Sequence, residues 1–161
     1  MDIARLYDRY GDSMYRYLAA KIGSASDAED VLQEVFCRLV RYGVRLKLLR
    51  KPRVFVFRVA RNEANRFLRS RLQNNSALRS METSPDSFLC SYAGPDVPTE
   101  RLVADALAQL PGDQREAVVL KVFEGLTFRE IAAVCDDPIP TVASRYRYAM
   151  DKLRGLLEGK L

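Results

Sequence analysis

The sequence predicts an all-α protein with two small helical domains joined by a flexible linker, the C-terminal domain containing a helix-turn-helix. Apolar residues recur every three or four positions along most of the chain, and no segment alternates with the two-residue period of a strand. Residues 73–98 instead contain three prolines among Asn, Ser, Gly and Asp, a composition typical of a tether. We therefore expect domains at 1–72 and 99–161, and 161 residues of which 48% are hydrophobic can bury a core.

The first helix is expected from Asp2 to Ala20, ending near Gly23. A second helix is expected to open at Ser26, because Ser26 and Glu29 have the spacing of a capping box. Gly43 is the expected end of that helix. Its predicted buried stripe consists of Val31, Leu32, Val35, Phe36, Leu39 and Val40.

Acidic residues lie on the opposite side of this second helix. Asp27, Asp30 and Glu34 follow one another at i, i+3 and i+7 and form an acidic ridge. Helix capping and solvation account for Asp27, which favours the positive end of the helix dipole. They account less well for Glu34, so the acidic ridge is a candidate binding surface.

A third helix is expected to start near Pro52, whose fixed φ suits the first helical position. Its polar face carries arginine, which can fork onto phosphate, and asparagine, whose amide can pair with base edges. This Arg/Asn ridge consists of Arg58, Arg61, Asn62, Asn65 and Arg69.

The positive charge of the chain is concentrated around that helix. Residues 46–80 hold ten Lys and Arg but one acid, Glu63, for a net charge of +9. Residues 1–45 and 111–161 are neutral, and residues 81–110 carry −4. A basic block of this kind indicates a polyanionic partner, the alternative being a solvated helix face.

The C-terminal domain is expected to begin with Thr99 as a helix cap, and a second helix should run from Asp113 to Phe123. Thr127 and Glu130 have capping-box spacing ahead of a short helix. Residues 136–140 then interrupt the helical pattern before a longer final helix begins. The short helix, this interruption and the final helix together make a helix-turn-helix pattern.

In the final helix, apolar positions repeat at intervals of four and three residues and should face the core. These are Val142, Tyr146, Ala149, Leu153 and Leu156. Thr141, Ser144, Arg145 and Tyr148 remain on the outer face, where a recognition helix meets the major groove. Arg145 can fork onto a guanine, and Arg147 and Lys152 are expected to reach phosphates.

Other function classes find little support. The three cysteines are far apart, without a CxxC pair, and the chain has no histidine, so we expect no metal site and no cofactor. Cys37 is expected in the core, while Cys135 closes an apolar helix and Cys90 falls in the linker. A helical hydrolase is disfavoured because no glycine-rich phosphate loop and no nucleophile beside an evident base are found.

The sequence also gives no sign of a membrane segment. No apolar run approaches the roughly 20 residues of a membrane-spanning helix. The N-terminal residues are amphipathic and partly acidic, unlike a signal peptide. We expect a soluble, cytoplasmic protein that does not insert into membranes.

Three stretches in the same order resemble bacterial sigma factors of the extracytoplasmic-function (ECF) group, which belong to the sigma-70 family. They are DAEDVLQEVFCRLVR, VFRVARNEANRFLR and LPGDQREAVVLKVFEGLTFREIAAVCDDPIPTVASRYRYAMDKLR. The resemblance covers nearly everything except the linker. It implies a non-enzymatic, two-domain initiation factor that binds core RNA polymerase and promoter DNA, and that an anti-sigma factor can hold inactive.

The resemblance also assigns residues to each partner. Docking on core polymerase is implied for Asp27, Asp30, Gln33 and Glu34. Opening and capture of the −10 strand is implied for Lys51, Phe55, Arg58, Arg61, Asn62, Asn65 and Arg69. Contact with the −35 duplex is implied for Arg129, Thr141, Ser144, Arg145, Arg147, Tyr148 and Lys152. A regulator that binds DNA without polymerase is the alternative, but it leaves both the acidic ridge and the Arg/Asn ridge unassigned.

Four positions depart from the family pattern. Phe55 stands where tryptophan is usual, and Arg66 occupies a position that is often acidic. Asp136 replaces a glycine in the turn, which remains feasible because aspartate tolerates a left-handed φ. Pro140 replaces another glycine, in the first turn of the final helix, where proline is accepted.

Overall fold

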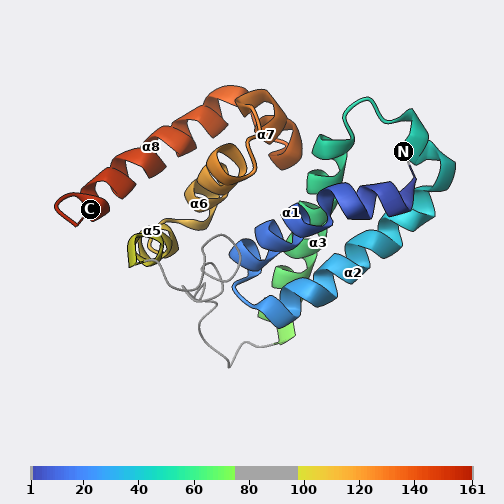
Figure 1. Ribbon diagram of the computed structural model, residues 1–161, viewed down its shortest axis with the longest axis horizontal. Helices are drawn as coiled ribbons and strands as arrows, with labels where there is room; N and C mark the ends of the chain where they lie inside the picture. The colour runs from blue at the N-terminus through green and yellow to red at the C-terminus, as the bar shows by residue number, and fades with distance from the viewer. Residues whose placement is uncertain (1, 75–97, 161) are drawn as a thin grey trace.

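The computed structural model describes residues 2–74 and 98–160, and it is helical in both ranges, which confirms the all-α prediction (Figure 1). No strand occurs among these residues. The N-terminal domain contains α1 (Ile3–Ile22), α2 (Ala25–Tyr42), the 3₁₀ helix η1 (Gly43–Leu48) and α3 (Pro52–Asn74). The C-terminal domain contains α5 (Pro98–Ala108), α6 (Gly112–Val118), the π-helical turn η2 (Val119–Phe123), α7 (Phe128–Cys135) and α8 (Ile139–Leu157).

The ends of the first two helices follow from their capping residues. The Asp2 carboxylate accepts a hydrogen bond from the Arg5 amide at 2.9 Å, and Gly23 ends α1 with a φ of 82°. The predicted start of α2 at Ser26 was wrong. Ser24 has the extended backbone of an N-cap and its hydroxyl accepts from the Asp27 amide at 3.3 Å, so α2 begins at Ala25.

The core of the N-terminal domain lies where α1, α2 and α3 pack against one another. Tyr17 and Phe57 are fully buried there and meet edge to face, with ring centroids 5.7 Å apart. Glu63, the single acid of the basic block, is also buried and forms an ion pair with Arg38 of α2. Thus α3 is fixed by both apolar and charged contacts, and its exposed side is held rigidly.

The expected burial of Cys37 was wrong, because its side chain is exposed. The buried stripe of α2 runs along Ala28, Val31, Val35 and Leu39. Cys37 lies two residues after Val35, about 200° around the helix, and so faces away from that stripe. Val40, expected in the same stripe, is 58% exposed for a similar reason.

Helix ends also organise the C-terminal domain. Thr99 is not a cap as predicted, because α5 begins at Pro98 and Thr99 lies within its first turn. The Arg115 guanidinium satisfies the carbonyls at the other end of α5, donating to Leu107 and Ala108 at 3.0 and 3.1 Å. The predicted helix from Asp113 to Phe123 is divided into α6 and the π-helical turn η2.

The helix-turn-helix pair has the local chemistry that the sequence predicted. Both hydrogen bonds of the Thr127–Glu130 capping box are present, at 3.1 and 3.0 Å. Asp136 ends α7 with a left-handed φ of 56°. Pro140 lies in the first turn of α8, whose buried residues include Val142, Ala149 and Leu153. The turn is therefore closed without glycine.

The two domains pack together in this structure. Helix α3 lies against α7, and the buried apolar residues of both domains belong to one connected cluster. Figure 1 shows the C-terminal helices on one side of α1 and α3, with α2 on the other side. Within the residues described, no helix is both long and apolar enough to cross a membrane.

Candidate nucleic-acid interface

Most of the Arg/Asn ridge on α3 faces solvent. Arg58, Asn62 and Arg69 are exposed, and Asn65 is half-buried. Arg69 also donates to the Asn65 carbonyl at 3.3 Å, one helical turn back. Since the opposite side of α3 is packed in the core, these side chains project from a helix whose position is fixed. Arg66 adds a further exposed cation beside them.

An aromatic pair joins the end of α2 to the first turn of α3. The rings of Tyr42 and Phe55 are 4.9 Å apart between centroids and stand edge to face. The Arg45 guanidinium lies 5.9 Å from the Tyr42 centroid, and Lys51 is exposed just before α3. Sequence reasoning named Phe55 and Lys51 but missed Tyr42, which is 39% exposed and offers a second ring on which a base can stack.

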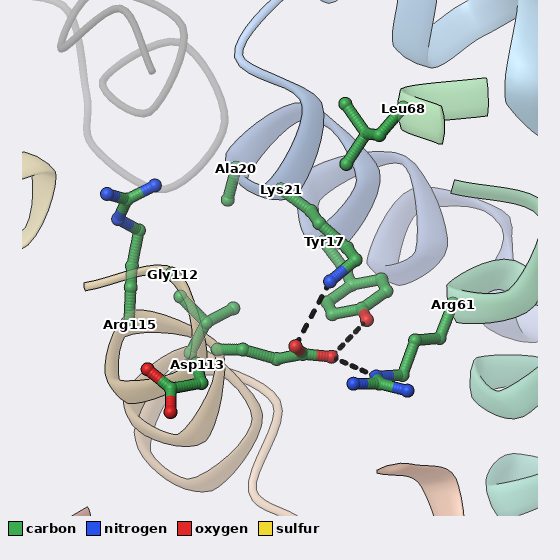
Figure 2. A pocket seen from close by; sticks show the side chains of 10 residues that line it. Tyr17, Ala20, Lys21, Arg61, Leu68, Gly112, Asp113 and Arg115 are labelled. Atoms are coloured by element: carbon green, nitrogen blue, oxygen red, sulfur yellow. Dashed lines mark hydrogen bonds and ion pairs between the residues drawn. The ribbon is translucent and has the colours of Figure 1, made fainter. Parts of the chain in front are cut away.

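Arg61 differs from the rest of the ridge because it contacts the other domain. Its Nε donates to Oε1 of Glu116 in α6 at 2.7 Å, and its Nη1 donates to the Cys135 carbonyl at 3.4 Å. Glu116 also accepts from the Tyr17 hydroxyl at 2.7 Å and from Lys21 Nζ at 3.1 Å. Figure 2 shows Tyr17, Lys21 and Arg61 converging from the N-terminal domain on one carboxylate.

The environment of this cluster keeps Glu116 and Arg61 charged. Burial alone would raise the pKa of Glu116, but Lys21, Arg61 and the Tyr17 hydroxyl outweigh it and hold that pKa below its usual value. Burial likewise opposes the charge of Arg61, yet Glu116 raises its pKa above the usual value. Burial, followed by the Glu116 charge, raises the pKa of Cys135 to about 12, so its thiol stays protonated at neutral pH.

The outer face of α8 carries the residues predicted for the −35 duplex. Arg147, Tyr148 and Lys152 are exposed, and Arg129 is exposed in the first turn of α7. Arg147 lies over the Tyr148 ring at 5.3 Å from the centroid. Thr141 and Ser144 are half-buried near the start of the helix.

Arg145 is held by two carboxylates of its own domain. Its Nη1 donates to Asp137 Oδ2 at 2.7 Å, and its Nε lies 3.3 Å from Asp113 Oδ2. Hydrogen bonding to Asp137 raises its pKa. Arg145 therefore braces α8 against the turn and α6, and these two contacts compete with a base for its guanidinium.

The acidic ridge on α2 also contains both exposed residues and one residue that is paired within the chain. Asp30, Gln33 and Glu34 are exposed. Asp27 forms an ion pair with Arg71 at 3.1 Å, which ties the start of α2 to the end of α3. Capping and pairing thus give Asp27 a structural role, while Asp30, Gln33 and Glu34 stay predictions as polymerase contacts.

Known proteins match both domains. Residues 6–73 match the family model described as Sigma-70 region 2, and residues 100–153 match Sigma-70, region 4. The ECF RNA polymerase sigma factor SigL of Mycobacterium tuberculosis is 31% identical over 95% of this chain and 87% of SigL. The chain belongs to the ECF sigma factors.

Two further proteins support this membership. The ECF RNA polymerase sigma factor BldN of Streptomyces coelicolor is 34% identical across 81% of this chain, which matches 50% of BldN. The fold is similar to that of the sigma factor RpoE from Bartonella quintana, solved with the anti-sigma factor NepR, with a TM-score of 0.80 at 22% identity over 99% of each chain. As an ECF sigma factor, this protein is a transcription initiation factor, which confirms the family resemblance and disfavours a regulator independent of polymerase.

Proposed function

We propose that the two domains of this sigma factor divide promoter recognition between them. The N-terminal domain binds core polymerase through the exposed part of the acidic ridge and captures the −10 strand with η1 and α3. The C-terminal domain recognises the −35 duplex with α8. The observation that carries the proposal is the presence of both sigma regions in one chain, each with its predicted polar face mostly exposed.

The −10 assignment combines stacking with charge. Phe55 and Tyr42 supply rings, while Arg58 and Arg69 supply cations along the path of a single strand. A flipped base needs a stacking surface, and the exposed backbone needs positive charge beside it. The amide of Asn62, exposed between these arginines, is suited to a base edge.

In this proposal, the chain carries no catalytic group of its own. Phosphodiester formation belongs to polymerase, and the sigma factor works in the cytoplasm, where polymerase and promoters are found. An anti-sigma factor that covers both domains would prevent both kinds of contact.

Run-off transcription tests the proposal. Purified full-length protein is mixed with core polymerase and a library of promoter fragments, and selective transcripts together with co-elution are expected. A protein that binds DNA but neither co-elutes with core nor directs initiation would contradict the proposal.

The acidic ridge is tested by charge reversal. The Asp30→Lys/Glu34→Lys variant is expected to lose affinity for core polymerase, because two exposed carboxylates become cations. Asp105→Lys, at an exposed acid of α5, is the control and should bind normally. Circular dichroism and thermal melting check that α2 remains folded. If the double variant binds core polymerase with normal affinity, the acidic ridge is a solvated helix face and not a binding surface.

A further inference from the structure

The contact between the domains uses a residue that the family resemblance assigns to DNA. Arg61 belongs to the Arg/Asn ridge, yet its guanidinium is bound to Glu116 of the C-terminal domain. Of the Glu116 side chain, 7% is exposed, so solvent hardly reaches this pair. Arg61 cannot offer the same donor to a DNA phosphate while this contact lasts.

The site around Glu116 has the chemistry of a small anion site. Two cations, Lys21 and Arg61, and the Tyr17 hydroxyl donate to one carboxylate from two different helices of the N-terminal domain. A phosphate diester oxygen is an acceptor of the same charge and takes the same donors. We propose that Glu116 acts as an intramolecular competitor of promoter DNA, occupying Lys21 and Arg61 in the closed protein.

Neighbouring contacts hold the same two domains together. Arg53, in the first turn of α3, donates to the Glu124 carbonyl, and Arg16 of α1 lies 3.7 Å from the Glu124 carboxylate. Three basic residues of the N-terminal domain besides Lys21 thus contact acceptors of the C-terminal domain. The closed state draws on the positive charge of the N-terminal domain, and at Arg61 closure and DNA binding exclude one another.

This inference rests on the proposed role of α3 in −10 binding, and it has a thermodynamic consequence. If only the open chain exposes Arg61, the apparent affinity for the −10 strand falls by the fraction of molecules that are open. Weakening Glu116 should then strengthen DNA binding, although the residue belongs to the other domain. Merely structural packing would give no such gain.

The test uses the full-length chain without polymerase. Glu116→Gln keeps the shape of the side chain and removes its charge, and Lys21→Gln weakens the same contact at a partly exposed residue, where folding is less at risk. Glu158→Gln, at an exposed acid after α8, is the matched control. Small-angle X-ray scattering measures opening, circular dichroism measures folding, and anisotropy of a labelled single-stranded −10 oligonucleotide measures binding.

We expect Glu116→Gln to increase the radius of gyration and to tighten oligonucleotide binding about three- to tenfold, while Glu158→Gln changes neither. The gain should disappear in the Arg61→Ala background, because the competitor acts through that residue. Folded Glu116→Gln and Lys21→Gln proteins with unchanged scattering and unchanged affinity would overturn the inference. That failure is distinct from failure of the proposed function, which the wild-type run-off assay reports separately.

Discussion

Replacing Arg145 with alanine separates two roles that its position allows. The side chain is 28% exposed and contacts Asp137 at 2.7 Å and Asp113 at 3.3 Å. Pairs with this much solvent contact contribute about 0.2–1 kcal/mol each, so losing both should lower the free energy of unfolding by about 0.4–2 kcal/mol. A bidentate guanine contact contributes about 1–3 kcal/mol of discrimination, or about 5- to 150-fold in affinity.

Two measurements distinguish these effects. Urea unfolding of the full-length chain gives the structural loss. Holoenzyme binding to a promoter duplex selected by the wild-type protein, compared with the same duplex carrying an altered −35 element, gives the base contact. Arg145→Ala should lose affinity on the selected duplex and little on the altered one.

Arg147→Ala provides the comparison for a phosphate contact. It removes the same charge from an exposed position two residues away and should weaken both duplexes alike. If Arg145→Ala also weakens both duplexes equally, or only lowers the free energy of unfolding, then Arg145 is a brace of the turn and makes no base contact.

Two further predictions concern stability and pH. Thr127→Ala should lower the free energy of unfolding by about 1 kcal/mol through loss of the capping box, while Thr127→Ser should retain it; equal urea midpoints for all three proteins would contradict this. Because its pKa is lowered in the folded protein, Glu116 stabilises the domain contact above the ordinary glutamate pKa of about 4.3, and this stabilisation is lost as pH falls through the lowered value. X-ray scattering should therefore show that the chain is still closed at weakly acidic pH. A chain that already opens near neutral pH would contradict the role of this carboxylate.

Local chemistry made most of the fold predictable. Gly23 ends α1, Thr127 and Glu130 cap α7, and Asp136 adopts the left-handed turn that its side chain tolerates. Each of these depends on residues within one helical turn. The cap of α2 was misplaced because Ser24 and Ser26 both suit the position, and only the extended backbone at Ser24 distinguishes them.

The unexpected features depend on contacts between distant parts of the chain. Arg61 and Glu116 are separated by 55 positions, and the spacing of neither residue in its own helix indicates the other. The exposure of Cys37 had a local signal, since its position falls outside the four-residue spacing of Val31, Val35 and Leu39. The docking of α3 on α7 had none, because it requires both domain surfaces at once.

Each predicted DNA-binding face contains one arginine that is bound by carboxylates of the same chain. Arg61 is bound by Glu116, and Arg145 is bound by Asp137 and Asp113. Other cations of these faces, such as Arg58 and Lys152, remain exposed. Non-specific attraction to DNA arises mainly from exposed cations near phosphates, whereas the two held arginines must exchange an internal anion for the nucleic acid. The closed protein should therefore keep a weak, salt-dependent attraction to any DNA, while specific binding competes with the internal contacts of Arg61 and Arg145.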